Sequence, residues 1–365
     1  YTAIATVADV MDLEDENRII VKTGLKLLEH TNNKGLQAIL KVNQLDGKTI
    51  SAYHIGFIIG PCFNAAGRLE TVKIALDLLM CEDEKEALVI AEQLKALNES
   101  RKEMTVKGVE QAIEKIEHST LMQDKVLVVK LEDCHESLVG IIAGRIRERY
   151  HKPVLVFTDV EDGIKGSGRS IEAYNMFEEL NKCKKLLTRF GGHPMAAGVS
   201  METEKLEELR RCLNENTVLT EEDLCPVVWI DVPMPIGYIS EEFVEQLELL
   251  EPFGKGNTKP IFAEQHFRFL SGAVIGKNKN VFKCKLINDA GNRIEGIYFG
   301  DVETFRTYII AHFGETEYNK MLDGEKNAID LGLTYYPTVN EFRDQKTLQI
   351  VIQNYCAIAR KKVDK

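Results

Sequence analysis

The spacing of apolar and polar residues divides the chain into segments of different character. From about Ile19 to Val42, apolar residues recur three and four apart, which predicts helices with breaks at Gly24 and Gly35. A second helical stretch runs from about Val72 to Glu117, with an interruption near residues 81–83. A periodic run of that length often joins two domains as one helix, although two antiparallel helices of a bundle fit the pattern equally well.

Beyond residue 118 the period switches between strand and helix. Apolar runs at Lys125–Lys130 and 153–158 predict buried strands, and helical periods follow at 135–150, 175–189 and 204–213. This alternation predicts an α/β domain of about 100 residues. After about Thr220, short strand-like runs dominate around a single predicted helix, Val302–Phe313, which favours a small β-barrel of the oligonucleotide-binding type.

Composition narrows the class of protein. The formal net charge of −11 argues against a general polyanion binder, but it leaves room for a local basic groove. The eight cysteines are scattered and form no Cys-x-x-Cys pair, so neither a zinc site nor a disulfide framework is predicted, and a reducing cytoplasm fits best. Apolar runs of about 18 residues are absent, so a membrane-spanning segment is not expected.

The N-terminus predicts a fragment. The chain starts at Tyr1 without an initiator Met, and it enters at once an apolar stretch, Thr2 to Val10, that is typical of a buried strand. A domain does not usually begin inside a strand. We therefore expect that a preceding segment of the protein is missing.

The sharpest motif is Arg-Phe-Gly-Gly-His-Pro-Met-Ala-Ala-Gly at residues 189–198. Two glycines allow a ligand to approach the backbone closely, and an imidazole after them donates to a phosphate or assists a leaving group. The alternative is a tight turn whose His193 caps a helix end.

Lys-Gly-Ser-Gly-Arg-Ser, residues 165–170, predicts an anion site. Backbone N–H groups of a Gly-rich turn, a hydroxyl and a guanidinium together suit a phosphate, and the arginine fork binds phosphate oxygens in pairs. Taken alone, a surface loop explains this stretch better.

Three further segments are candidates. Asn-Ala-Ala-Gly-Arg, residues 64–68, places small residues ahead of an arginine at a helix start, or else serves a tight helix–helix contact. His135 and Glu136 fall in the first turn of a predicted helix, where the glutamate alternatively only favours the helix dipole. Asp9 ends the first apolar stretch, where a carboxylate suits a hard cation or simply caps a loop.

The β-rich part offers a basic hairpin. Phe282 is flanked by four lysines, at positions 277, 279, 283 and 285. A basic face with a stacking aromatic ring binds single strands in oligonucleotide-binding barrels. The equally weighted alternative is a solvated hairpin with Phe282 in the core.

In chain order, these segments resemble the motifs of RecJ-type exonucleases, members of the DHH phosphoesterase superfamily. The Gly-Gly-His stretch resembles the signature of the DHH-associated domain, and residues 64–68 resemble the RecJ Asn-Ala-Ala-Gly-Arg motif. Residues 6–18 resemble the fourth motif of the DHH catalytic domain, and residues 250–263 resemble the entrance to the RecJ barrel. The chain departs from the family at Cys134, where RecJ proteins usually have Trp, which puts an aromatic contact in doubt.

The resemblance implies an α/β plus β fold in four parts. They are the C-terminal remnant of a DHH α/β domain (1–80), a connecting helix (81–118), an α/β DHH-associated domain (119–218) and an oligonucleotide-binding β-barrel (219–365). It also implies that His193 is catalytic and that Asp9 ligates a catalytic Mn²⁺ or Mg²⁺. The DNA contacts that it implies come from Asn64, Arg68, His135, Ser167, Gly168, Arg169, Gly191, Gly192 and Lys283.

The implied activity is two-metal hydrolysis of single-stranded DNA from its 5′ end, in recombination and repair. The other metal-binding motifs of the family lie upstream of Tyr1, so we expect this chain to be inactive alone but able to bind single-stranded DNA. Implied partners are a helicase and a single-strand binding protein, and the chain is expected to be a monomer.

Three alternatives stay open. They are a DHH phosphodiesterase of short oligoribonucleotides or cyclic dinucleotides, a non-catalytic replication scaffold, and a tRNA-editing protein. The last requires a neighbouring set of zinc-binding His and Cys residues, which the sequence does not offer. The upstream sequence would separate the first two.

Overall fold

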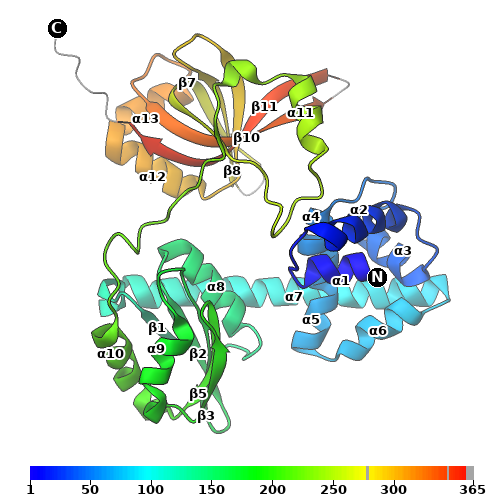
Figure 1. The fold of residues 1–365 in the computed structure, drawn as a ribbon, viewed down its shortest axis with the longest axis vertical. Coiled ribbons are helices and arrows are strands. Elements are labelled where there is room, and N and C mark those ends of the chain that lie inside the picture. Colours follow the sequence, from blue (N-terminus) through cyan, green and yellow to red (C-terminus); the bar gives the residue numbers. More distant parts are fainter. Residues whose placement is uncertain (277–278, 343–344, 359–365) are drawn as a thin grey trace. The chain divides into compact units, whose positions relative to one another are not determined.

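The computed structural model describes residues 1–276, 279–342 and 345–358. The chain forms two compact units (Figure 1). Unit 1 comprises Tyr1–Val10 and Thr23–Val227, and unit 2 comprises Met11–Lys22 and Val228–Lys365. No helix within the described ranges combines the length and apolarity that crossing a bilayer requires.

The N-terminal part of the chain is helical throughout. Its elements are α1 (Thr2–Ala8), α2 (Asp15–Glu29), α3 (Lys34–Val42), α4 (Ala52–His54), the π-helix Ile55–Ile59, α5 (Gly60–Leu69) and α6 (Val72–Met80). The buried strand predicted for residues 2–10 is therefore wrong. Ala3 and Thr6, one turn apart, are the buried residues of α1, so the stretch buries one face of a helix.

The predicted breaks at Gly24 and Gly35 are also wrong, because both glycines lie inside helices. A side chain at Gly24 would overlap the Ala3 side chain, and one at Gly35 would overlap the Leu78 carbonyl. These glycines are therefore sites of close approach between helices rather than helix ends.

A single 34-residue helix, α7 (Glu84–Glu117), follows. Asp83 caps its first turn by accepting from the N–H groups of Lys85 and Glu86. Buried residues recur along both halves of the helix, from Ala87 to Ile116. The second part of the predicted stretch is thus one continuous helix, and α6 forms its first part. That α7 connects two domains stays a prediction, because both of its ends lie in unit 1.

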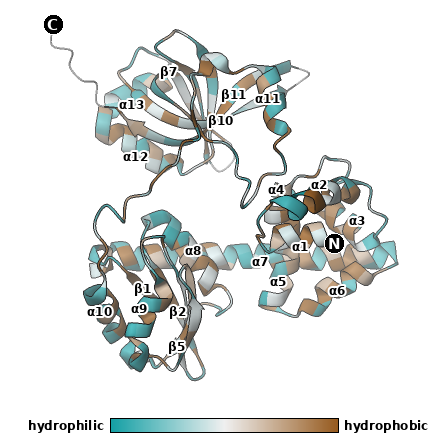
Figure 2. Ribbon diagram, in the orientation of Figure 1, coloured by the Kyte–Doolittle hydropathy of each residue, from teal (hydrophilic) through white to brown (hydrophobic). Residues whose placement is uncertain are grey.

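The α/β part is a five-stranded sheet in the order β1-β2-β3-β5-β4. Its strands are β1 (Leu127–Leu131), β2 (Val154–Val160), β3 (Gly163–Arg169), β4 (Arg189–His193) and β5 (Ala196–Met201). β1 and β2 are parallel, and the other pairs are antiparallel. Helices α7 and α8 (Val139–Tyr150) cover one face, and α9 (Met176–Lys182) and α10 (Leu206–Asn216) cover the other, with apolar side chains packed between each helix pair and the sheet. Figure 2 shows the same elements coloured by hydropathy.

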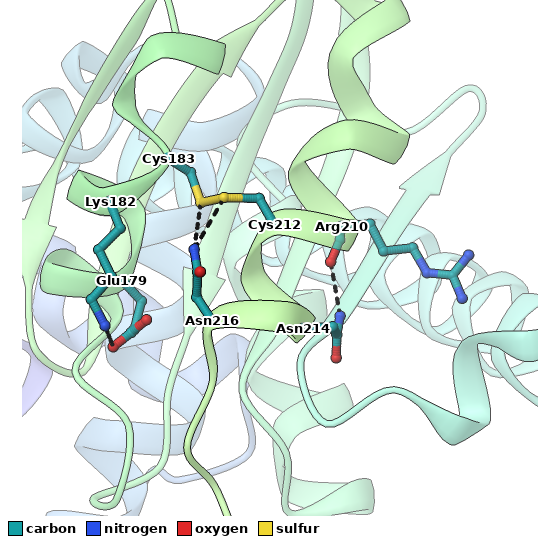
Figure 3. Close-up of a disulfide and its surroundings, with 7 residues drawn as sticks. All are labelled: Glu179, Lys182, Cys183, Arg210, Cys212, Asn214 and Asn216. Atoms are coloured by element: carbon teal, nitrogen blue, oxygen red, sulfur yellow. Dashed lines mark hydrogen bonds and ion pairs between the residues drawn. A yellow bond between two sulfur atoms is a disulfide. The ribbon is translucent and has the colours of Figure 1, made fainter.

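Two local predictions fail in this sheet. The helix expected over 175–189 ends at Lys182, and residues 189–193 form the outer strand β4 rather than a turn. The absence of disulfides is wrong as well, because Cys183 and Cys212 are joined (Figure 3). They lie 29 residues apart in the sequence, so no short spacing motif announces the pair.

Unit 2 is a closed barrel with flanking helices, as predicted. The sheet order β10-β11-β9-β8-β7 closes because β10 also pairs with β7. The strands are β7 (Phe262–Ile275), β8 (Val281–Ile287), β9 (Arg293–Tyr298), β10 (Asp330–Phe342) and β11 (Gln345–Ala357), preceded by the short β6 (Val232–Pro233). The helices are α11 (Glu241–Glu248), α12 (Val302–Phe313) and α13 (Glu315–Leu322), of which α12 has the predicted bounds.

Candidate nucleic-acid end site

Strand β3 sorts the Lys-Gly-Ser-Gly-Arg motif onto two faces of the sheet. Ser167 pairs across the ladder with Val156, whose side chain packs in the core beneath α8. Because side chains alternate along a strand, Lys165 and Arg169 share this face with Ser167. Gly168 lies on the opposite face, where a Cβ would contact Met176 and Leu155. On the α8 face, the motif therefore offers a ligand the side chains of Lys165, Ser167 and Arg169. Gly168 lies on the other face and does not contact a ligand bound there.

The predicted backbone cradle at this motif is wrong. Residues 163–169 pair with β2 on one side and β5 on the other. Their N–H groups are thus committed to the sheet and do not form an anion nest. What remains for an anion is the hydroxyl of Ser167 and the guanidinium of Arg169.

The β4–β5 hairpin continues this face in register. Arg169 lies opposite Ala196, which lies opposite His193. Likewise Ser167 lies opposite Gly198, which lies opposite Gly191. His193 is thus two strands from Arg169, about 10 Å at ordinary strand spacing. The register therefore groups Ser167, Arg169, Gly191 and His193 on one face, as the sequence predicts.

Two glycines form an open floor between these side chains. Gly191 and Gly198 are exposed, and a Cβ built on either would meet no heavy atom within 4 Å. Gly192 points the other way, where a side chain would overlap the backbone of Ala196 and Ala197. Gly192 thus permits the hairpin, whereas Gly191 leaves space for a ligand.

Arg169 is held by neutral acceptors of its own strand. Its Nη1 donates to Ser167 Oγ at 2.9 Å and to the Gly168 carbonyl at 2.8 Å. Burial, with the nearby charges of Arg68 and Arg147, lowers the pKa of the Arg169 guanidinium from its ordinary value. A positive charge that is partly desolvated and repelled by other cations is stabilised when an anion binds beside it.

Gly140 makes room for this arrangement. It lies in α8, and a Cβ there would come within 3.0 Å of Arg169 Nη2 and 3.1 Å of Ser167 Oγ. We did not identify Gly140 from the sequence. A glycine inside a helical period is a weak signal of such close approach.

The Asn-Ala-Ala-Gly-Arg motif lies in α5. Ala65 and Ala66 are fully buried, consistent with the tight helix packing considered above, while Asn64 and Arg68 are exposed. Arg68 lies in the last turn of α5, so its expected place at a helix start is wrong. Its Nη1 donates to the Ser137 carbonyl at 2.7 Å, which fixes α5 against the loop before α8.

A second arginine, Arg101 on α7, belongs with this group but was missed in the sequence. It donates twice, at 3.1 and 3.0 Å, to the side-chain oxygen of the buried Asn98. Burial, together with the charges of Arg68 and Arg145, lowers the pKa of Arg101. Within the described ranges Arg68, Arg101 and Arg169 form no ion pair with a carboxylate. An arginine in the middle of a long charged helix carries no local signal of such a role.

His135 and Glu136 precede α8 instead of lying in its first turn, because the helix begins at Val139. His135 Nδ1 lies 2.8 Å from Ser137 Oγ. Glu136 forms an ion pair with Lys165 at 2.6 Å, and that hydrogen bond lowers the pKa of Glu136. His135 lines a cleft of about 600 Å³ that also holds the carboxylates of Glu136, Asp159, Glu161 and Asp162. Such surroundings disfavour a phosphate there.

His193 does not cap a helix. Its Nδ1 accepts from the Met195 N–H at 3.3 Å across the turn of the hairpin. In the neutral ring this leaves the proton on Nε2, which points away from the turn as a donor. His193 is exposed, so this donor is accessible to a ligand.

Asp9 follows the last residue of α1 and is exposed. In the part of the chain that the structure describes, no group of three or more His, Cys, Asp or Glu residues is arranged to hold a metal ion. The described residues therefore do not form a complete divalent-metal site by themselves. Asp9 alone would supply one ligand.

The basic hairpin of unit 2 differs from the expected stacking surface. Phe282 is fully buried in the barrel core, so the stacking role is wrong and the core alternative holds. Lys283 forms an ion pair with Glu295 at 2.8 Å, which neutralises its charge. Lys277 lies outside the described residues.

Comparison with known families fits this geometry. Residues 123–218 match the DHHA1 domain, and residues 230–354 match the RecJ OB domain. The chain is 38% identical over 292 residues to the single-stranded-DNA-specific exonuclease RecJ of Bacillus subtilis, and 33% identical over 366 residues to that of Escherichia coli. The chain belongs to the RecJ family.

The alignments cover 79% of this chain with the B. subtilis RecJ and 96% with the E. coli RecJ. They cover only 37% and 60% of those relatives, so the chain spans less than two thirds of their length. The crystal structure of RecJ in complex with Mg²⁺ from Thermus thermophilus shares the fold, with a TM-score of 0.79 at 22% identity over 98% of this chain and 52% of that one. A second structure of that RecJ contains Mn²⁺.

Proposed function

We propose that this chain supplies the DNA-end-binding part of a RecJ-type 5′→3′ exonuclease for single-stranded DNA. The α/β part, 119–218, receives the terminal phosphate, and the barrel, 219–365, guides the strand. Residues 81–118 connect the α/β part to the catalytic remnant, 1–80. The observation that carries this proposal is the glycine floor of Gly191 and Gly198, bordered in register by Ser167, Arg169 and His193.

The chemistry of this face suits a phosphate monoester. Arg169 supplies guanidinium N–H donors, Ser167 a hydroxyl, and His193 an Nε2–H donor, all on one face of the sheet. The floor lacks side chains, so a nucleotide end approaches the sheet closely. Arg68 and Arg101 belong to the same unit and add to its positive field. This field attracts the phosphate backbone of a nucleic acid strand.

Divalent metal ions, Mn²⁺ or Mg²⁺ as in the T. thermophilus structures, would activate a water for attack on the scissile phosphate. Asp9 is the residue of this chain that we assign to them. Because the described residues offer no complete ligand set, we expect no hydrolysis by the chain alone. His193 then acts in the full enzyme by holding the phosphate or protonating a departing oxygen.

The test compares two single-stranded oligonucleotides that differ only at the 5′ end, one phosphorylated and one with a free hydroxyl. Fluorescence anisotropy should show tighter binding of the phosphorylated strand. Arg169→Ala should remove that preference while leaving the weaker binding of the hydroxyl strand, because only the end contact is lost. Equal affinity of both strands for the unaltered chain would overturn the proposal.

Arg211→Ala is the matched control, since Arg211 is an exposed arginine of α10 on the opposite face of the sheet. It removes the same charge from the chain without touching the site. The incubation of either strand with Mn²⁺ should release no mononucleotide. Metal-dependent release would show that the described residues suffice for catalysis.

The family resemblance alone supports the remaining assignments. We propose a helicase and a single-strand binding protein as partners, a monomer as the functional state, and a cytoplasmic location, where the DNA substrate is present. The oligoribonucleotide and cyclic-dinucleotide alternatives are less favoured because the barrel that matches the RecJ OB domain has no use on a two-nucleotide substrate.

A further inference from the structure

The disulfide lies on the face of the sheet opposite the proposed end site. Cys183 follows the last residue of α9, and Cys212 lies in the middle of α10, with Cα atoms 6.5 Å apart (Figure 3). The segment between them, residues 184–211, contains β4, β5 and the turn that joins them. The bond therefore closes a loop that carries the glycine floor and His193.

The attachment of β4 explains why this loop is sensitive to the bond. β4 is an edge strand, paired only with β5, whereas β5 is also paired with β3. Only residues 184–188 separate Cys183 from the start of β4. When the bond is present, the chain entering β4 is also fixed to α10; when it is absent, β4 is held by its pairing with β5 and by the contact of Phe190 with Phe177 of α9.

Cys183 is buried at the edge of the core, whereas Cys212 is half-buried and is the sulfur within reach of a solvent reagent. Cys183 and Cys212 border a surface hollow of about 270 Å³ that also contains Lys185 and Arg211. Asn216 Nδ2 donates to Cys212 Sγ at 3.3 Å and to Cys183 Sγ at 3.9 Å (Figure 3). The hollow also contains Glu208 and Glu215, which offset these cations, so the Asn216 amide donor is what stabilises a thiolate, the form that exchanges with a disulfide.

The other cysteines are separate from this pair. Cys62 and Cys284 are buried, and burial raises the pKa of each thiol, which keeps them neutral and slow to react. Cys81 and Cys134 are half-buried and Cys225 and Cys356 are exposed, and none of these four is bonded in the structure. Oxidation therefore has one intramolecular outcome within the described residues.

We propose that Cys183 and Cys212 form a reversible thiol–disulfide site, and that the oxidised form holds the β4–β5 hairpin in the conformation that binds a 5′ phosphate. The oxidant is a small-molecule disulfide such as oxidised glutathione. The thiolate of Cys212, the more exposed of the two, attacks one sulfur of it and releases one small thiol. The thiolate of Cys183 then attacks the Cys212 sulfur and releases the second small thiol. Two protein thiols are oxidised and one small disulfide is reduced.

The regulatory part of this inference rests on the proposed end-binding function; the chemical part does not. The experiment equilibrates the full chain with defined ratios of reduced and oxidised glutathione, traps free thiols by alkylation and locates the bond by peptide mass spectrometry. Hydrogen exchange of the β4 amides and affinity for a 5′-phosphorylated oligonucleotide are then measured in both states. Cys212→Ser represents the permanently reduced pair, and Cys225→Ser is the control thiol.

We expect a Cys183–Cys212 bond in oxidised samples, exchange of β4 amides at least about tenfold faster after reduction, and a severalfold weaker affinity for the phosphorylated strand in the reduced chain and in Cys212→Ser. Cys225→Ser should respond to glutathione as the unaltered chain does. A pair that stays reduced in excess oxidised glutathione overturns the site. A bond that forms without changing β4 exchange overturns its control of the hairpin.

The two proposals fail separately. If neither redox state prefers a phosphorylated end, the end-binding function is wrong, while the bond and the exchange of β4 are judged on their own readouts. If the preference exists but is equal in both states, the end site stands and the redox control is overturned.

Discussion

Replacing Gly198 by valine tests the end site without damaging the fold. Gly198 lies in β5 between Ser167 and Gly191, and a Cβ there meets no heavy atom within 4 Å. A β-branched residue suits a strand, and the propensity difference is at most about 1 kcal/mol, so Gly198→Val should unfold no more easily than the unaltered chain. The valine methyl groups, however, occupy the floor on which the nucleotide end is proposed to lie.

The expected loss of affinity follows from the contacts that the valine blocks. A charge-assisted hydrogen bond contributes about 1.5–3 kcal/mol. If the ligand no longer reaches Arg169, binding of the phosphorylated strand should weaken by roughly 10- to 150-fold. Binding of the strand with a 5′ hydroxyl should change little, because it never makes this contact.

Gly166→Ala is the matched control on the other face of the same sheet. Its Cβ would lie 2.5 Å from the Phe157 ring, in the core beneath α9 and α10. We expect a loss of roughly 1–3 kcal/mol of stability from overpacking, with end binding of the folded protein unchanged. Urea unfolding followed by circular dichroism and anisotropy with both strands measure the two effects. Unchanged end preference in Gly198→Val would refute the proposed floor.

Three further predictions concern the same unit. Reduction of the Cys183–Cys212 bond should lower the free energy of global opening, measured by hydrogen exchange of the β2 amides, by about 3.5 kcal/mol, the loop-closure value for a loop of this length; a change under roughly 1 kcal/mol would show that the reduced pair already restrains the loop. Arg101→Gln should reduce the slope of log affinity for single-stranded DNA against log salt by about 0.7, and an unchanged slope would exclude a phosphate contact. Alkylation of the native chain should modify Cys225 and Cys356 first and Cys62 and Cys284 last, since burial raises the pKa of the latter two thiols; rapid modification of Cys62 by peptide mapping would contradict the packing of α5.

Site residues within one strand could be predicted from the sequence, because side chains alternate between the two faces of a strand. Site residues whose role depends on packing between separate elements could not. The alternation in β3 places Ser167 and Arg169 on one face and Gly168 on the other; from the sequence, residues 163–170 were predicted as either a Gly-rich turn or a short strand, and the anion site was argued from the turn. The glycines of β4 were mistaken for a turn because an edge strand of five residues has too little apolar pattern to be distinguished. Arg101 and Gly140 were invisible, since their roles arise only when α7 and α8 are packed against the sheet.

In the barrel, the elements could be predicted from the sequence, but the role of one residue could not. Its strands and α12 were predictable because alternation and helical spacing are strong over these segments. The role of Phe282 was not, because alternation shows that Lys283 and Phe282 face opposite ways but not which way is outward. The closed barrel decides the question, since Phe282 packs against Phe269 and Phe305 in the core.

A chain with a net charge of −11 attracts DNA only if its cations are not consumed internally. Many of its lysines and arginines are neutralised by ion pairs, as Lys283 is by Glu295 and Lys165 is by Glu136. Arg68, Arg101 and Arg169 are held instead by a carbonyl, an amide oxygen and a hydroxyl, which orient a guanidinium without neutralising it. Positioning the charges with neutral acceptors keeps them available for an anion, and their mutual repulsion is relieved when a phosphate binds. If the proposed end site binds a phosphate, the local field of this unit, rather than the charge of the whole chain, therefore selects that ligand.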